Sequence, residues 1–329
     1  MSRSSLRRHS LVASALLGAA TLAQPSLAQT YPTKTVRMNV PYSSGSGPTT
    51  FMRIVAEKLS TTWGRQAIIE AKPGASGFLA IDTVKTAAPD GYELLVVSNA
   101  HVTINPTLYK KLPYDPERDF VPVASLFITP FFVTVSATGA YQTVPALIAG
   151  GKTVQGGLSF GTPYVGSPGH LGGALLSSLT GANMVYIHFK DQGQLFTTLA
   201  SNDLAWTLAT VGTALSFTKS GRLKHIAIAA KERLKSMPDI PTVTEAGGPA
   251  GYEVDSWLAL MAPRGTPAEI VRKINADINK LFSDPDMLSR MQTLGYEPMP
   301  GTPEQLAELI RVDSKKYSEL VRKSGATAE

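Results

Sequence analysis

Small hydroxyl residues and glycines are concentrated in one stretch of the sequence, residues 40–50, where they could bind an anion. Two of its glycines permit unusual backbone angles and the close approach of a ligand. An apolar alternation precedes the stretch and a helical pattern follows it, so it reads as the loop between a strand and a helix. Amides at a helix start and neighbouring hydroxyls donate to anions. We therefore expect a carboxylate-binding loop, with ligand contacts from Tyr42, Ser46, Gly47, Thr49 and Thr50.

A second loop of this kind lies in the middle of the chain, where residues 161–170 separate a short strand from a helical pattern at 171–179. Its helix start would present donors to a second anion. For Ser167 the alternative is a simple helix cap, and for His170 it is packing at the helix start. The ligand contacts expected here are Ser167, Pro168, Gly169 and His170.

A third group of polar residues, Ser98 and Asn99, follows the apolar run at 93–97. Polar residues at the carboxyl end of a strand line the ligand site of many α/β sheets. The alternative is an ordinary turn, in which Ser and Asn are common. We include both residues among the expected ligand contacts.

The first 28 residues have the features of a secretory signal peptide. They combine Arg3, Arg7 and Arg8, an apolar stretch and a small-residue ending, which predicts cleavage after about Ala28 and export to the periplasm. The apolar stretch is shorter than the roughly 20 residues that span a bilayer, which disfavours the alternative of a membrane anchor. The net charge of +6 includes these three arginines and no acidic residue of the leader, so +3 remains. That balance gives no reason to expect a nucleic-acid partner.

Strand and helix patterns alternate along the rest of the chain, which predicts an α/β fold with doubly wound sheets. We expect strands at 35–40, 67–71 and 93–97, and helices from the first loop to Trp63 and over 78–87. About 300 residues exceed the usual size of a single core, so two domains are expected. The chain has no cysteine, which excludes disulfides and thiolate chemistry.

Two crossings between the domains are expected, near residue 131 and near residue 253. Domain I would then comprise residues 29–130 plus 254–329, and domain II residues 131–253. Two crossings form a hinge, and small ligands bind in the cleft between hinged domains. We expect the last residues, from Ser324, to fray.

Several short motifs, in this order, make the chain similar to one family from about Tyr31 to its end. They are Tyr31-Pro32-Thr33-Lys34, Val40-Pro41-Tyr42, Lys72-Pro73-Gly74-Ala75, Ala88-Pro89-Asp90-Gly91-Tyr92, Lys111-Leu112-Pro113-Tyr114-Asp115-Pro116, Gly166-Ser167-Pro168-Gly169-His170-Leu171, Pro238-Asp239-Ile240-Pro241-Thr242-Val243 and Ala262-Pro263-Arg264-Gly265-Thr266-Pro267. The chain resembles the Bug-type periplasmic solute receptors of tripartite tricarboxylate transporters. The resemblance implies a two-lobed fold like that of type II periplasmic binding proteins. It also implies capture of a carboxylate between the loops around Ser46 and Ser167, for delivery to membrane permease subunits.

Two departures from the family pattern bear on the ligand. Thr49 stands where many members have an acidic residue, and Ala209-Thr210 stands where many have Asp-Asn. An acidic side chain would suit an ammonium and repel a carboxylate, so its absence at both places favours a ligand that is anionic at both ends. We therefore include Thr210 among the expected contacts.

Aromatic side chains could add a flat wall to the site. Four rings could stack on a flat ligand, those of Trp206, Trp257, Tyr42 and Phe160. For each of them a place in a core is the stronger alternative, since a Trp or Phe on a strand usually belongs to a core. Stacking of this kind led us to expect an aromatic dicarboxylate such as terephthalate, ahead of aliphatic dicarboxylates such as malate or succinate, with a tricarboxylate also open.

The sequence does not suggest an enzyme. It lacks a Gly-x-Ser-x-Gly elbow and a His-Glu-x-x-His pair, and its histidines lie apart. We expect a monomer without a cofactor or metal ion. A periplasmic sensor subunit of a two-component system remains the alternative to a transport receptor.

Overall fold

The computed structural model describes residues 31–163, 165–189 and 191–328, so the predicted signal peptide lies outside the described residues. Its strands are β1 (Val36–Val40), β2 (Ala67–Ala71), β3 (Glu93–Ser98), β4 (Phe120–Pro130), β5 (Phe132–Ser136), β6 (Leu158–Thr162), β7 (Met184–His188), β8 (Trp206–Ala209), β9 (Leu223–Ile228), β10 (Asp255–Pro263) and β11 (Glu297–Pro298). Its longer helices are α1 (Gly47–Trp63), α2 (Phe78–Lys85), α5 (Val144–Thr153), α6 (Pro168–Thr180), α7 (Gln192–Ala200), α8 (Val211–Lys219), α9 (Ala268–Leu281), α10 (Pro285–Leu294) and α11 (Pro303–Ser324). The shorter helical turns are η1 (Ala75–Gly77), η2 (Ala100–Ile104), α3 (Asn105–Leu108) and α4 (Pro116–Asp119).

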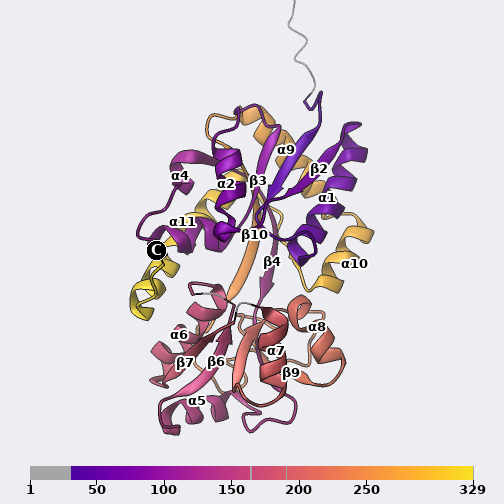
Figure 1. The fold of residues 1–329 in the computed structure, drawn as a ribbon. Helices are drawn as coiled ribbons and strands as arrows, with labels where there is room; N and C mark the ends of the chain where they lie inside the picture. The colour runs from indigo at the N-terminus through magenta and orange to yellow at the C-terminus, as the bar shows by residue number, and fades with distance from the viewer. Residues whose placement is uncertain (1–30, 164, 190, 329) are drawn as a thin grey trace, which may run out of the picture. The chain divides into compact units, whose positions relative to one another are not determined.

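The first sheet has six strands in the order β11-β4-β10-β3-β1-β2. β1 pairs in parallel with β2 and β3, and β10 pairs antiparallel with β3 and β4. Apolar residues of α2 and α11 share a buried cluster with Trp257 of β10, while α1 and α9 lie on the other side of the sheet (Figure 1). Because both faces are covered, the central strands are apolar almost throughout, as expected for a sheet buried on two sides.

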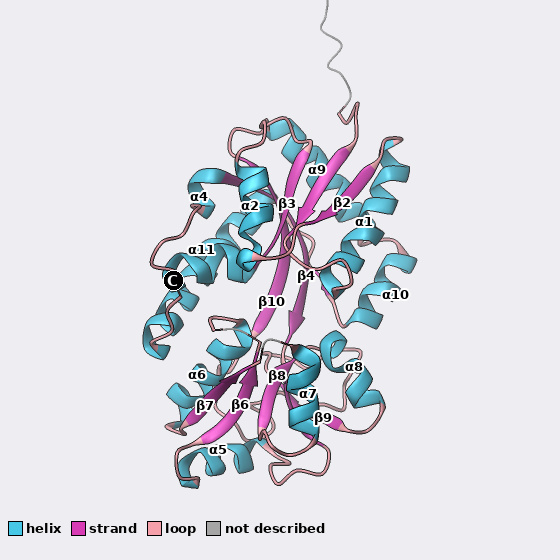
Figure 2. Cartoon of the chain, viewed as in Figure 1, coloured by secondary structure: helices cyan, strands magenta, loops and turns pink. Residues whose placement is uncertain are grey.

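The second sheet has five strands in the order β7-β6-β8-β5-β9. β6 pairs in parallel with β7 and β8, and β5 pairs antiparallel with β8 and β9. Residues of α5 and α6 share one apolar cluster with the sheet, and residues of α7 and α8 share another (Figure 2). Each sheet therefore has a hydrophobic core of its own.

The chain passes between the sheets at two places, which lie side by side. The amide of Phe131 donates to the carbonyl of Val254 at 3.0 Å, and the amide of Val254 donates to the carbonyl of Ala229 at 2.8 Å. β4 and β10, which lead to these points, are the longest strands of the first sheet (Figure 1). The first sheet is built from strands within predicted domain I and the second from strands within predicted domain II, while the exact domain boundaries stay a prediction.

The C-terminal segment differs from expectation. Fraying from Ser324 is wrong, because the amide of Ala328 donates to the carbonyl of Leu108 at 2.8 Å and the amide of Lys110 donates to the carbonyl of Ala328. Ala328 is thus held against the segment at the end of α3. Among the residues that the structure describes, the search for an apolar helix of membrane-spanning length finds none.

Candidate functional site

The first predicted loop ends in a capped helix. Ser46 is the N-cap of α1, where its Oγ accepts from the amide of Thr49 at 3.4 Å and lies 2.9 Å from Thr49 Oγ1. Thr49 is buried and Thr50 is exposed. At Gly47 an added Cβ would lie 2.6 Å from the hydroxyl oxygen of Tyr296, so only glycine fits there without a shift. The helix start is therefore fixed by both the cap and this close approach.

The second predicted loop is built in the same way. Ser167 is the N-cap of α6, where its Oγ accepts from the amide of His170 at 3.1 Å and lies 2.7 Å from Thr162 Oγ1. The amide of Gly166 donates to His170 Nδ1 at 3.0 Å, and the His170 ring meets the ring of Tyr186 edge-on. Pro168 and Gly169 are buried in the first turn of the helix. Capping and packing, both left open by the sequence, thus occur here, and a ligand contact of these four residues stays a prediction.

The polar residues after β3 have different surroundings. The Ser98 amide and hydroxyl both lie near His101 Nδ1, at 3.1 and 3.0 Å. Asn99 is fully buried: its amide nitrogen donates to the carbonyl of Asp255 and to the hydroxyl of Tyr317, and its Oδ1 accepts from the Ala100 amide. The Asn99 amide therefore ties the end of β3 to the start of β10 and to α11.

A cavity of about 190 Å³ brings two of the predicted regions together. Tyr42, within the first loop, and Val165, immediately before Gly166 and Ser167, both line it. The remaining walls come from three turns of the first sheet, and they are Pro41, Gly74, Ser76, Gly77, Ala100, His101, Asn105, Leu108 and Tyr109. None of these lining residues is acidic, lysine or arginine. The cavity is smaller than the roughly 300 Å³ at the low end of drug-sized pockets, which suits a small ligand.

The predicted aromatic wall is largely absent from this cavity. Trp206 is completely buried in the core of the second sheet, where it stacks on Phe160, and Trp257 is buried under α11. Of the four rings considered, Tyr42 alone is among the residues that line the cavity. Thr210 caps α8 in a reciprocal arrangement with Thr213 and does not line the cavity either. Both tryptophans are therefore core residues, which is the alternative that the sequence left open.

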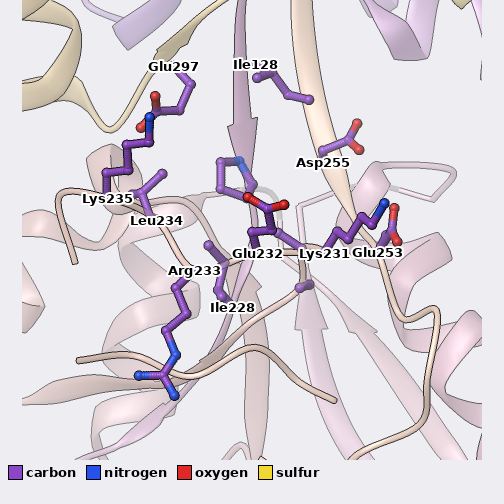
Figure 3. Close-up of a pocket in the computed structure, with 13 residues that line it drawn as sticks. Ile128, Ile228, Lys231, Glu232, Arg233, Leu234, Lys235, Glu253, Asp255 and Glu297 are labelled. Atoms are coloured by element: carbon purple, nitrogen blue, oxygen red, sulfur yellow. The ribbon is translucent and has the colours of Figure 1, made fainter. Parts of the chain in front are cut away.

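A larger cavity, of about 360 Å³, lies where the chain crosses between the sheets (Figure 3). Four carboxylates line it, those of Glu232, Glu253, Asp255 and Glu297. In Figure 3, Lys231 points toward Glu253 and Lys235 toward Glu297, while Arg233 points away from the other labelled side chains. Arg233 bonds instead to Glu245 at 2.8 Å. Because the carboxylates outnumber the cations left to face them, this cavity would repel an anion.

Some lining residues were not among the sequence predictions. Gly74, Ser76 and Gly77 follow β2, and Leu108 is the last residue of α3. Local pattern does not place this turn beside Tyr42, whereas the strand order β2-β1-β3 does. Parallel strands bring their carboxyl ends to one edge of the sheet, and this signal could have pointed to the turn.

Buried titratable groups predict how stability depends on pH. Burial lowers the pKa of His101 and of His225 to about 4, so on acidification the unfolded chain takes up protons before the folded chain does. As the pH falls from about 6.5 toward 4, each histidine therefore lowers the free energy of unfolding by about 1.4 kcal/mol per pH unit. Asp255 has the opposite effect, because burial raises its pKa to about 6. Below that pH the folded chain takes up this proton before the unfolded chain does, which raises the free energy of unfolding.

We expect a net loss of about 2 kcal/mol in the free energy of unfolding between about pH 7 and pH 5, measured by urea denaturation. Burial also lowers the pKa of His170, which adds to the loss, and raises the pKa of Asp313, which opposes it. Equal or greater stability at the lower pH would contradict the dominance of the buried histidines.

Comparison with known proteins gives the family. Residues 51–326 match the model described as "Tripartite tricarboxylate transporter family receptor". Protein BugT of Bordetella pertussis is 29% identical over 94% of this chain and 95% of its own length.

Solved structures align over nearly their whole length. R. palustris Rpa4515 with adipate has a TM-score of 0.81 at 26% identity and covers 90% of this chain and 99% of its own. MatC from Rhodopseudomonas palustris with bound malate has a TM-score of 0.76 at 29% identity, covering 88% and 100%. Periplasmic binding protein BugD has a TM-score of 0.76 at 27% identity, covering 91% and 100%.

These matches confirm the predicted two-lobed α/β fold and the prediction that the chain is not an enzyme, since the family consists of transporter receptors. The chain belongs to the receptor family of tripartite tricarboxylate transporters, as a Bug-type member.

Proposed function

We propose that this chain is a periplasmic receptor that captures a small dicarboxylate and presents it to the membrane permease subunits of a tripartite tricarboxylate transporter. The observation that carries the proposal is the 190 Å³ cavity, which has Tyr42 beside one capped helix start and Val165 beside the other. Pro48 and Pro168 have no N–H, and the amides of Thr49 and His170 donate to the capping serines. The amides that each first turn can still offer to an anion are those of Gly47 and Gly169. A ligand with a carboxylate at each end can engage both.

The walls of the cavity support an anionic ligand over an amino acid. No acidic residue lines it, so an ammonium group would find no counter-ion there. The two positions at which the family pattern often has an acid are Thr49 and Ala209 here. Thr49 lies against the Ser46 cap, and Ala209 is buried. Two structural relatives hold dicarboxylates, adipate and malate. Aliphatic dicarboxylates are therefore our first choice of ligand.

An aromatic dicarboxylate such as terephthalate is the second candidate. The half-buried ring of Tyr42 lines the cavity and supports it, because an aromatic ring can stack on a flat ligand. The two tryptophans give no further support, since both are core residues.

Capture would work by closure about the two crossings between the sheets. We propose that residues 29–130 plus 254–329 and residues 131–253 move as two domains of a monomer. A ligand that spans both helix starts stabilises only the closed form, so a permease that recognises this form responds to the ligand.

Three helix caps provide a test with a built-in control. Ser46→Ala, Ser167→Ala and Thr143→Ala each remove a side chain that accepts from a helix amide, so each should cost about 1 kcal/mol of stability. Thr143 caps α5, and it lines neither the cavity at the crossings nor the cavity beside Tyr42. Affinity for dicarboxylates should fall about tenfold in the first two variants and stay unchanged in Thr143→Ala.

The measurement is a thermal-shift titration of the secreted protein with adipate, malate, succinate, terephthalate, glutamate and acetate. A ligand at about 100 times its Kd stabilises by about 2.7 kcal/mol, which is readily detected. A response to glutamate alone, or equal affinity losses in all three variants, would contradict the proposal.

A further inference from the structure

The bonding of the His101 imidazole fixes its tautomer. Its Nδ1 lies 3.1 Å from the amide nitrogen of Ser98, and an amide can only donate. Nδ1 is therefore the acceptor of this hydrogen bond. Burial lowers the pKa of His101 to about 4, so the ring is neutral near pH 7. In a neutral ring whose Nδ1 accepts, the proton is on Nε2, and His101 carries one N–H donor there.

That donor has no hydrogen-bond partner among the residues that the structure describes, although His101 is only 7% exposed and lines the cavity beside Tyr42. The neighbour in front of it is Gly77. A Cβ at this position would lie 2.7 Å from Nε2 and 2.9 Å from the Cβ of Pro41. Glycine thus keeps open the space that the Nε2–H group faces.

The cavity offers a second donor, on the exposed side chain of Ser76. The hydroxyl of Tyr109 donates to Ser76 Oγ at 2.9 Å, which leaves the hydroxyl proton of Ser76 to be donated in turn. Neither His101 nor Ser76 carries a charge at neutral pH. The rest of the lining includes apolar residues such as Pro41 and Leu108 and also the polar Asn105, whose amide nitrogen donates to the Tyr114 hydroxyl at 3.1 Å. His101 and Ser76 are thus two donors of the cavity that an acceptor atom of a solute can satisfy.

We infer that His101 is a specificity-determining residue that donates its Nε2–H to an oxygen atom of the captured solute. A solute with an acceptor oxygen at this point completes the hydrogen bond, whereas one with an ammonium meets a donor and leaves Nε2–H buried without a partner. Such an unpaired donor is costly in a buried site. The inference rests on the proposed function and names the polar contact that selects among carboxylates.

Two substitutions separate ligand binding from packing. Asn at position 101 can place an oxygen near the position of Nδ1 and accept from Ser98, but it does not reach the position of Nε2. Gln can place an N–H donor near the position of Nε2, but it does not replace the Nδ1 acceptor. We expect His101→Asn to keep most of the stability and lose about tenfold or more in affinity, and His101→Gln to lose stability yet keep more of the affinity.

Calorimetric titration with succinate, malate and adipate, alongside urea unfolding, provides the readout. Loss of affinity for all three in His101→Asn supports a contact to a carboxylate oxygen, and loss for malate alone supports a contact to its hydroxyl. If affinity follows stability, so that His101→Asn retains both and His101→Gln loses both, the residue is structural and the inference is wrong. A wild-type protein that binds no carboxylate would instead contradict the proposed function, and the inference with it.

The second buried histidine serves as a control. His225 lies near the crossings, with its Nδ1 2.8 Å from Thr134 Oγ1, and it does not line the cavity beside Tyr42. His225→Gln should change stability without changing affinity for any of the three ligands. A matching loss of affinity in this variant would show that the effect at His101 is transmitted through folding.

Discussion

Trp257→Phe is expected to lower the free energy of unfolding by about 2 kcal/mol more than Trp206→Phe. Both rings are buried, and phenylalanine leaves a similar void at each place. The difference lies at the indole nitrogen. Trp257 Nε1 donates to Asp313 Oδ2 at 2.6 Å, while Trp206 Nε1 is buried without a partner among the described residues. Removing the Trp257 indole N–H leaves the buried Asp313 carboxylate without its donor. Removing the Trp206 indole N–H leaves no other group without a partner.

Equilibrium unfolding in urea measures this difference, and titration with a dicarboxylate adds an independent readout. Neither variant should change affinity by more than about twofold, because both tryptophans lie in cores away from the cavity. A large loss of affinity with little change in stability would restore the stacking role that the sequence had left open for them. Equal destabilisation by the two substitutions would contradict the importance of the Asp313 contact.

Asn99→Ala is expected to cost about 3 kcal/mol of stability, because the substitution breaks several buried hydrogen bonds at once. The Asn99 amide nitrogen lies 3.2 Å from the carbonyl oxygen of Asp255 and 3.3 Å from the hydroxyl of Tyr317, and its Oδ1 lies 3.3 Å from Ser256 Oγ. Asp255 and Ser256 begin β10, the strand that leaves the second crossing. The loss of Asn99 would therefore loosen the point about which we propose that the domains close.

Two further substitutions calibrate this result. Tyr317→Phe removes only one member of the network and should cost about 1 kcal/mol. Asn183→Ala removes an exposed amide that donates to Gly156 at 3.3 Å, and it should cost at most about 0.5 kcal/mol. If Asn99→Ala is no more destabilising than Asn183→Ala but abolishes ligand binding, Asn99 is a ligand residue and its network contributes little to stability.

Local patterns in the sequence were sufficient to predict β1, the loop that follows it and the helix α1. The predicted first strand and the predicted helix end at Trp63 agree with the structure to about one residue, whereas α1 begins at Gly47, inside the predicted loop. The same patterns could not distinguish a cap from a ligand contact at Ser46 and Ser167. A serine at an N-cap satisfies a helix amide whether or not an anion binds nearby, so its sequence signal is the same in both cases.

Features that depend on distant parts of the chain were not predictable from local pattern. Tyr296 closes the space around Gly47, and Ala328 pairs with the segment that follows Leu108. Both contacts join positions far apart in the sequence, where periodicity carries no information. The cavity has the same origin, because its walls come from turns that meet only after the parallel strands have paired.

The most direct test of the account is a calorimetric titration with adipate and with hexanoate, which has the same chain length but a single carboxylate. We expect adipate to bind at least about 100-fold more tightly, equivalent to about 2.7 kcal/mol, because only a dicarboxylate can engage both capped helix starts. Equal affinities would contradict the central claim that one carboxylate binds at each of the two helix starts.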